Sequence, residues 1–304
     1  MKEKPVLPPF LRRGDKVAIV SPSGVVRQEA VLSAIKVIEA WGLKVVTGKH
    51  IFASDTIFAG TDDQRLADLQ EALDDSSVKA IIFSRGGYGF SRIIDRIDFS
   101  TFSVSPKWLV GYSDITVLHL WVNSLFGFAT IHGEMPLNYA NPTRAPRTIE
   151  SVRQMLFGEP EPLDWKGTAV NAKTVSGILT GGNLSLVYAM AATVARPEPA
   201  GRILFIEDIG EYYYHLDRMM VALKLSGMLS NLTALLVGSF DDMKEPDGAY
   251  GKTTEEIITD IAGGLGFPIF FGFPAGHTPD NVALRMGSEA EISLTVDGYR
   301  LRYI

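Results

Sequence analysis

Short apolar segments alternate with segments of helical period along the first half of the 304-residue chain. The apolar segments are five or six residues long and rich in valine and isoleucine, whereas the stretches between them repeat apolar residues every three or four positions. The first pattern is typical of strands and the second of amphipathic helices. Strands are predicted over 16–20, 43–47, 78–83, 107–111 and 128–132, and helices over 27–41 and 62–73, from Phe90 and from Asp114. This alternation predicts an α/β fold with a doubly wound parallel sheet.

The second half of the chain shows a more mixed pattern, which predicts a smaller α/β domain with more antiparallel strands. Between the two halves the sequence is rich in proline and irregular, as is typical of a connection. We therefore expect an N-terminal domain over residues 1–140, a linker over 141–170 and a C-terminal domain over 171–304. A cleft between two such domains would be a natural active site.

Three loops that follow predicted strands carry candidate chemistry. They are SPSG at 21–24, SRGGYG at 84–89 and GYSD at 111–114. In a doubly wound sheet, the loops at the carboxyl ends of the strands form the binding crevice. We therefore expect these three loops to lie near one another.

Ser113 lies where a predicted strand ends and a helix begins, which allows two interpretations. Its hydroxyl could be a nucleophile that projects from the crevice beside helical N–H groups. Alternatively, Ser113 or Asp114 could simply cap the helix. The G-x-S-x-G pattern of α/β-hydrolases is absent, because Ile115 stands at the position of the second glycine.

A nucleophilic serine needs a base, and the chain has five histidines. His277 is the first choice, because its loop, GFPAGHTPDN, is rich in the turn-forming residues that hold a side chain in place. His132 ends a predicted strand and is the second choice. His119 is expected to pack in the core, and His50 and His215 are expected to have surface or interface roles.

A carboxylate at the end of the apolar segment LFIED could orient such a base. Both Glu207 and Asp208 occupy suitable positions, and a solvated acidic strand end is the alternative. The chain order serine, acid, histidine is also that of the α/β-hydrolases.

The glycines of SRGGYG would let backbone N–H groups approach a ligand closely. The segment is not a dinucleotide fingerprint, because Arg92 stands where the third glycine would be. An oxyanion hole is therefore preferred. Arg85 could bind a substrate carboxylate or form a structural salt bridge.

Composition excludes several classes of function. The chain has no cysteine, which excludes a thiol nucleophile and disulfides. It has no H-E-x-x-H motif and no complete G-x-x-x-x-G-K-[ST] phosphate loop, so we expect neither a metal nor a cofactor. A net charge of −6 disfavours nucleic acid as a partner. The longest apolar run, about ten residues from Leu186, is too short for membrane insertion, and the N-terminus lacks a signal pattern, so we expect a cytoplasmic protein.

Six motifs in order resemble the serine LD-carboxypeptidase family, also called muramoyl-tetrapeptide carboxypeptidases. The motifs are SRGGYGFSRII, LVGYSDITVLH, IHGEM, LTGGNLSLV, LFIEDIGEYYYHLDRMM and FGFPAGHTPDN. The resemblance implies a flavodoxin-like N-terminal sheet, a smaller mixed α/β domain and a homodimer. It also implies a metal-independent cytoplasmic hydrolase that removes the terminal D-alanine from murein tetrapeptide in cell-wall recycling. A related branch, the microcin self-immunity proteins, cleaves peptide–nucleotide conjugates and is the alternative.

Carried over to this sequence, the resemblance assigns the nucleophile to Ser113, the acid to Glu207 and the base to His277. It thereby favours Glu207 over Asp208. The oxyanion would be bound by the backbone N–H groups of Asp114 and Gly87, and Arg85 is our candidate for the substrate carboxylate. A non-enzymatic, two-lobed binding protein for a small ligand is a second alternative, against which the missing export signal counts.

Overall fold

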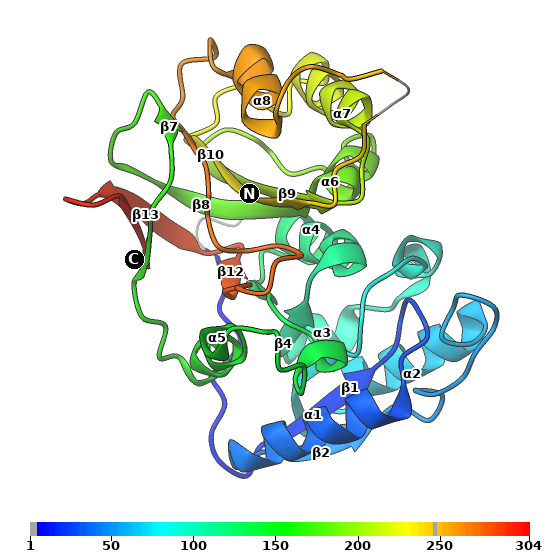
Figure 1. The fold of residues 1–304 in the computed structure, drawn as a ribbon. Helices are drawn as coiled ribbons and strands as arrows, with labels where there is room; N and C mark the ends of the chain where they lie inside the picture. Colours follow the sequence, from blue (N-terminus) through cyan, green and yellow to red (C-terminus); the bar gives the residue numbers. More distant parts are fainter. Residues whose placement is uncertain (1–4, 246–247) are drawn as a thin grey trace.

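The computed structural model describes residues 5–245 and 248–304, which form two sheets with flanking helices (Figure 1). In the first sheet, five parallel strands follow the order β2-β1-β3-β4-β5, and β12 adds an antiparallel edge. The strands are β1 (Lys16–Val20), β2 (Lys44–Thr47), β3 (Val78–Phe83), β4 (Trp108–Gly111), β5 (Thr130–His132) and β12 (Leu284–Met286). The order of the five parallel strands is that of flavodoxin. The predicted doubly wound, flavodoxin-like sheet is thus confirmed.

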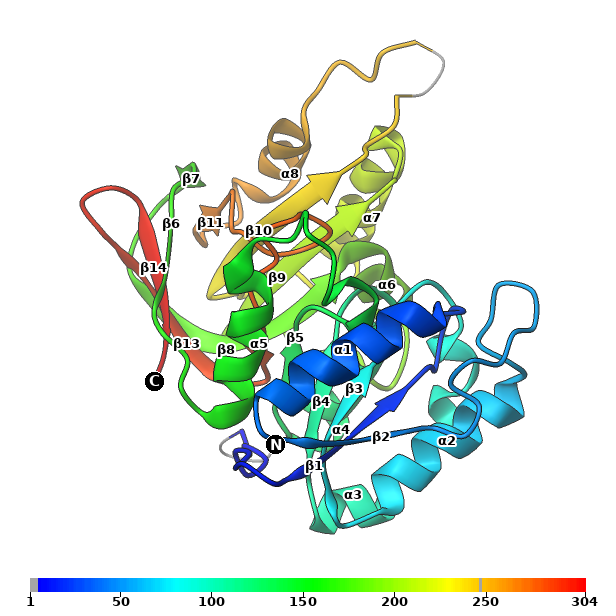
Figure 2. The same ribbon diagram turned by 60° about the horizontal axis from the view of Figure 1, so that its bottom comes forward.

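Alternation along the strands of this sheet divides its apolar residues between two cores. In β1, for example, Val17 and Ile19 face one side and Ala18 and Val20 face the other. The helices α1 (Gln28–Ala40) and α5 (Pro146–Phe157) cover the first side (Figure 2). The helices α2 (Asp62–Asp74), α3 (Ser100–Val104) and α4 (Thr116–Leu125) lie on the second.

The second sheet is mixed, as the sequence predicts. Strands β8, β9, β10 and β11 are parallel, and the remaining strands pair antiparallel at the two edges. The eight strands are β6 (Leu163–Trp165), β14 (Tyr299–Tyr303), β13 (Glu289–Leu294), β8 (Val175–Asn183), β9 (Arg202–Ile209), β10 (Ala234–Asp241), β11 (Ile269–Phe270) and β7 (Ala169–Val170). Helices α6 (Leu184–Met190), α7 (Tyr213–Leu225) and α8 (Thr254–Ala262) pack on one face.

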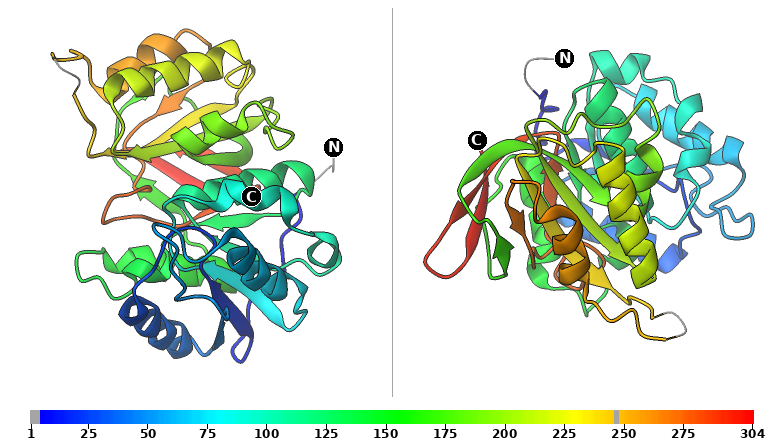
Figure 3. Two further views of the ribbon diagram at one scale, coloured as in Figure 1. Left: turned by 90° about the vertical axis from the view of Figure 1, so that its right-hand side faces the viewer. Right: turned by 90° about the horizontal axis from the view of Figure 1, so that it is seen from above.

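Helix α4, which follows Ser113, lies between the two sheets (Figure 3). The N–H of Asn183, at the end of β8, donates to Thr116 Oγ1 at 3.0 Å. Gly182 fits there because it lacks a side chain, since a Cβ would come within 2.5 Å of Thr116 Oγ1. One continuous apolar core therefore runs from α2 through α4 to α7 and α8 and fixes the two halves of the molecule relative to each other.

Two segments differ in detail from the sequence patterns. The helix expected from Phe90 is two 3₁₀ turns, Phe90–Arg92 and Ile94–Arg96, followed by α3. The 3₁₀ form is typical of short segments such as these. Residues 141–170, predicted as a linker, contain α5, β6 and β7. The domain boundaries stay a prediction.

None of the helices in the described ranges is long and apolar enough to cross a bilayer.

Candidate active site

Ser113 has a left-handed backbone conformation, with φ of 62°, at the turn between β4 and α4. Such a conformation costs energy in a residue other than glycine and is often found at functional sites. No side chain caps the 3₁₀ turn Ser113–Ile115 or α4, so the geometry does not support the interpretation of Ser113 or Asp114 as a helix cap. Ser113 is partly exposed, at the carboxyl end of β4.

The glycine loop 84–89 packs directly against Ser113. A Cβ on Gly86 would lie 2.9 Å from Ser113 Cβ and 3.0 Å from Ser113 Oγ. The loop is held from two sides: Gly24 N–H donates to Gly86 O at 3.1 Å, and Asp114 Oδ2 accepts a hydrogen bond of 2.9 Å from Phe90 N–H. The three loops expected to form a crevice therefore meet at the ends of β1, β3 and β4.

Asp114 supplies its buried carboxylate to this anchoring. Burial raises the pKa of Asp114, and the hydrogen bond from the Phe90 N–H opposes the rise. The side chain of Asp114 thus fixes the glycine loop to the turn that contains Ser113. Its backbone N–H is the predicted oxyanion donor.

Arg85 lies under the SPSG loop and is half-buried. Its Nη1 donates to the carbonyl of Val25 at 2.7 Å. Within residues 5–245 and 248–304, none of the ion pairs involves Arg85, so the structural salt bridge considered from the sequence does not form there. Gly87, two residues later, is exposed and has φ of 106°.

Glu207 and His277 form a hydrogen-bonded pair at the carboxyl end of the second sheet. His277 Nδ1 lies 2.7 Å from Glu207 Oε2, and the side chain of Glu207 is fully buried. Gly276 permits this approach, because a Cβ there would come within 3.0 Å of Glu207 Oε2 and 2.4 Å of Ser239 Oγ. With Nδ1 bound to the carboxylate, Nε2 is the ring nitrogen that can accept a proton.

The charge environment favours the protonated form of His277. Burial lowers the pKa of His277, but the charge and hydrogen bond of Glu207, with smaller contributions from Asp208 and Glu134, outweigh it, so that the pKa is raised. An acid that stabilises an imidazolium in this way is what a general base needs after it has taken a proton.

Tyr112 joins the two halves of the site. It immediately precedes Ser113, and its ring centroid lies 4.9 Å from that of His277. The residue before the nucleophile candidate of the first sheet therefore contacts the base candidate, which is itself paired with the acid candidate of the second sheet.

The carboxylate of Asp208 has different hydrogen-bond partners from that of its neighbour Glu207. It accepts hydrogen bonds from Asn183 Nδ2 at 2.8 Å and from Ser185 N–H and Ile209 N–H, both at 2.9 Å. Burial raises the pKa of Asp208 to about 6. Its contacts anchor the start of α6 to β9.

Comparison with known proteins identifies the family to which this chain belongs. The family model for the LD-carboxypeptidase N-terminal domain matches residues 17–133, and that for the C-terminal domain matches residues 176–292. A probable murein peptide carboxypeptidase of Bacillus subtilis is 33% identical over 94% of this chain and 91% of its own length. The chain belongs to the LD-carboxypeptidase family. It is therefore a serine carboxypeptidase, and the alternative of a non-enzymatic binding protein is not supported.

Other similar proteins are consistent with this family. The murein tetrapeptide carboxypeptidase of Pseudomonas aeruginosa is 32% identical and covers 95% of each chain. The crystal structure of the muramoyltetrapeptide carboxypeptidase from Oxalobacter formigenes is 30% identical, with a TM-score of 0.86 over 94% of this chain and 97% of that one. The microcin C7 self-immunity protein MccF of Escherichia coli is 24% identical over 96% of this chain and 94% of its own.

The other histidines of this family member have different surroundings from His277. His119 is buried, its Nε2 lies 2.8 Å from Gly111 O, and burial lowers its pKa to about 4. His132 is also buried, and burial lowers its pKa well below the ordinary value, with smaller effects of His119 and His277. His50 contacts Asp68 at 2.8 Å, and His215 pairs with Glu211.

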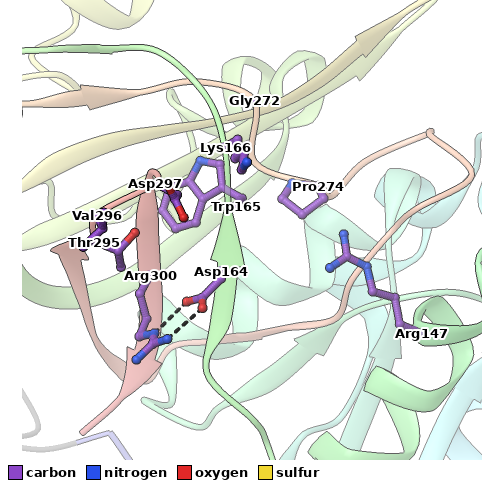
Figure 4. A pocket seen from close by; sticks show the side chains of 10 residues that line it. All are labelled: Arg147, Asp164, Trp165, Lys166, Gly272, Pro274, Thr295, Val296, Asp297 and Arg300. Atoms are coloured by element: carbon purple, nitrogen blue, oxygen red, sulfur yellow. Dashed lines mark hydrogen bonds and ion pairs between the residues drawn. The ribbon is translucent and has the colours of Figure 1, made fainter.

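A cavity of about 660 Å³ lies apart from this site, between β6, β14 and the segment 272–274 (Figure 4). Arg300 and Asp164 form an ion pair at 2.6 Å on its wall. None of Ser113, Glu207 and His277 lines it. This cavity is therefore not the place where the three predicted triad residues lie.

The sequence patterns missed three residues around His277. They are Tyr112, Glu134 and Arg144, of which the first two lie in the GYSD and IHGEM segments that carry the family resemblance. Nothing in their own spacing indicates that they converge on His277, because they come from segments far apart in the chain.

Proposed function

We propose that Ser113, Glu207 and His277 form the catalytic triad of an enzyme that hydrolyses the L,D-amide bond before the terminal D-alanine of murein tetrapeptides. The observation that carries the proposal is the 2.7 Å contact between His277 Nδ1 and Glu207 Oε2. It orients the imidazole and leaves Nε2 to act on a hydroxyl. The name of the P. aeruginosa relative, a murein tetrapeptide carboxypeptidase, supports the substrate.

In the proposed reaction, His277 Nε2 takes the proton of the Ser113 hydroxyl as Ser113 Oγ attacks the carbonyl before D-alanine. The resulting tetrahedral intermediate breaks its C–N bond, and the imidazolium gives its proton to the departing amino group of D-alanine. Water, activated by the same imidazole, then attacks the acyl-enzyme ester, releases the tripeptide acid and restores the hydroxyl. Glu207 stabilises the imidazolium in both halves.

The oxyanion of each tetrahedral intermediate is proposed to accept hydrogen bonds from the backbone N–H groups of Asp114 and Gly87. The close packing of Gly86 against Ser113 supports the assignment of the glycine loop to this role. Removal of one such donor typically raises the barrier by about 2.7–4 kcal/mol. The anchoring of the loop by Asp114 keeps these donors in place before substrate arrives.

Arg85 is proposed to bind the free carboxylate of the terminal D-alanine. It belongs to the loop that packs on Ser113, and its guanidinium carries no acidic partner among the ion pairs of the described residues. A guanidinium can bind a carboxylate through two parallel hydrogen bonds. This contact would select peptides with a free carboxyl end.

We further propose that the enzyme acts in the cytoplasm in peptidoglycan recycling, without metal or cofactor, and as a homodimer. The names of the relatives support a murein peptide as substrate. Light scattering of the purified protein tests the dimer directly, since a single species with the mass of one chain would contradict it.

The triad is tested by release of D-alanine from murein tetrapeptide by the wild-type protein and by Ser113→Ala. We expect activity in the wild type and a loss of at least about 10⁴-fold in the variant, because removal of the nucleophile removes the covalent route. Ser91→Ala, an exposed serine near the glycine loop, is the matched control and should retain activity. Turnover by Ser113→Ala at the wild-type rate would exclude Ser113 from the chemistry.

The alternative substrate is a peptide–nucleotide conjugate, as for the microcin self-immunity branch. The match to MccF along most of both chains favours including it in the test. When the conjugate and the tetrapeptide are supplied side by side, our proposal predicts the higher kcat/KM for the tetrapeptide. The reverse order would assign the chain to the immunity branch.

A further inference from the structure

Another buried carboxylate, Glu134, lies near the base of the proposed triad. Its Oε1 accepts hydrogen bonds of 3.0 Å from Met135 N–H and from Asn138 Nδ2, and its Oε2 lies 3.2 Å from Arg144 Nε. The side chain of Glu134 is fully buried and that of Arg144 is 13% exposed. A buried pair of this kind contributes little net stability compared with apolar residues, which raises the question of what the pair holds in place.

Arg144 connects Glu134 to the loop that carries His277. While its Nε faces Glu134, its Nη1 donates to the backbone carbonyl of Thr278, the residue after His277. The adjacent backbone continues the contact, since Ala145 N–H donates to Pro279 O at 3.0 Å. The loop is thus fixed from behind by the segment that begins at Arg144.

Tyr112 is a second neighbour of His277 that Glu134 affects. Burial, followed by the charge of Glu134, raises the pKa of Tyr112. The ring of Tyr112 lies 4.9 Å from that of His277, centroid to centroid. Glu134 therefore acts on both neighbours of the imidazole: its charge acts on Tyr112, and it forms an ion pair with Arg144, which holds the loop of His277.

We propose that Glu134 and Arg144 are positioning residues that hold His277 against Tyr112 and within reach of Ser113. This inference rests on the proposed function. It adds to the three triad residues a network that keeps His277 close to Ser113, across the two halves of the molecule. The network joins the segment after β5 to the loop before β12, so it acts where the first and second halves meet.

Arg147, in the first turn of α5, offers a matched control, because it contacts the same loop. It pairs with Asp280, three residues after His277, through a 2.6 Å contact from Nε to Oδ1. This pair is on the surface, with side-chain exposures of 51% and 35%. Exposed ion pairs contribute little to the stability of the structure around them. Arg147→Gln should therefore change kcat/KM by no more than about twofold.

Arg144→Gln is the first test, with murein tetrapeptide as substrate. We expect kcat to fall by about 10- to 100-fold with little change in KM, because a displacement of about 1 Å of a reacting group can cost this much. Arg144→Lys should recover only part of kcat, because one ammonium can face Glu134 but lacks the second, fixed nitrogen that binds the Thr278 carbonyl. Equal effects of Arg144→Gln and Arg147→Gln would overturn the proposal.

A double variant separates positioning from folding. Replacement of both partners in Glu134→Met/Arg144→Met avoids an unpaired buried charge and is expected to preserve the thermal unfolding temperature better than either single change. Our proposal predicts that kcat nevertheless stays low, because nothing then holds the Thr278 carbonyl. A double variant with wild-type stability and wild-type kcat would show that the pair has no positioning role.

An NMR measurement tests the network without any substrate. With ¹³C-labelled histidine, the ring protons of His277, assigned by comparison with His277→Gln, should show the ring-current shift of the adjacent Tyr112. We expect Arg144→Gln to move these resonances toward unfolded-chain values and Arg147→Gln to leave them in place. If the wild type releases no D-alanine but the shifts change as expected, the proposed reaction fails and the network stands. If D-alanine is released and neither variant moves the resonances, the network fails and the reaction stands.

Discussion

The ring of Tyr112 lies 4.9 Å from the ring of His277, although 165 residues separate them in the chain (277 − 112 = 165). The first residue directly follows β4 of one sheet and precedes Ser113, and the second lies in the loop between β11 and β12. This contact joins the turn that carries Ser113 to the loop that carries His277. It also makes Tyr112 a residue whose removal should loosen His277 without touching its carboxylate partner.

Replacement of Tyr112 should therefore affect catalysis through the ring more than through the hydroxyl. We expect Tyr112→Phe to retain most of kcat, because the ring still packs on His277. Tyr112→Ala should lower kcat strongly and cost about 3–5 kcal/mol of stability, as for other large buried aromatic residues. Steady-state kinetics and urea unfolding measure both. A Phe variant as inactive as the Ala variant would shift the role to the hydroxyl.

Gly86→Ala should impair catalysis with little effect on folding. The new methyl group would stand 2.9 Å from Ser113 Cβ and 3.0 Å from its Oγ, where it must displace the hydroxyl or the glycine loop. We expect kcat/KM to fall by about 100-fold, the typical cost of misplacing a reacting group by about 1 Å. Gly264→Ala is the control, because a Cβ there has no neighbour within 4 Å. Full activity of Gly86→Ala would argue against the glycine loop as part of the site.

The pH dependence of kcat/KM should report His277. The base acts when neutral, so activity should rise as pH rises through the pKa of His277, which the charge and hydrogen bond of Glu207 raise above the ordinary value despite the opposing effect of burial. Glu207→Gln removes that charge, so the acid limb should shift to lower pH while kcat falls by about 10⁴-fold, as in other triads that lose their acid. A limb that stays in place in Glu207→Gln would contradict this coupling.

The raised pKa of His277 also affects stability. Activity should rise with pH, whereas the contribution of His277 to the free energy of unfolding should fall. A histidine whose pKa is raised by folding binds its proton more tightly in the native state than in the unfolded chain. Its contribution to the free energy of unfolding is therefore fully present below the unfolded pKa, about 6.5, and is lost as pH rises through the raised native pKa. Urea unfolding across this range should show the loss in the wild type and a smaller one in Glu207→Gln.

The strands that the sequence predicts most closely are those enclosed by helices on both faces. The predicted ranges 16–20 and 78–83 match β1 and β3 to the residue, because each is a short apolar run that ends at turn-forming residues. Strand β12 carries no such signal, since its three residues form a strand only by pairing with β5. Helix α5 was hidden within a proline-rich segment, although proline at the first turn of a helix favours its start.

The residues of the candidate site also fall into two groups, those that the sequence predicts and those that only the structure indicates. Ser113, Glu207 and His277 are predicted from the sequence because each lies at or after the end of an apolar segment and stands in a motif of the family. Glu134 and Arg144 are not, because the role proposed for them arises from interactions with each other, with Tyr112 and with Thr278 that depend on how the two halves pack. Local patterns identify the groups that can do chemistry, whereas the groups that hold them require the tertiary structure.

Arg85→Ala tests the proposed carboxylate contact through a ratio of two substrates. The guanidinium also donates to Val25 O at 2.7 Å, so its loss will loosen the SPSG loop and reduce activity on any peptide. That part of the effect is equal for a tetrapeptide with a free carboxyl end and for its C-terminal amide. A hydrogen bond to a charged group contributes about 1.5–3 kcal/mol, so we expect the preference of the wild type for the free acid to shrink by about 10- to 100-fold in the variant. Because the shared loss cancels in the ratio, an unchanged preference would assign Arg85 to the loop alone and leave the carboxylate to another cation.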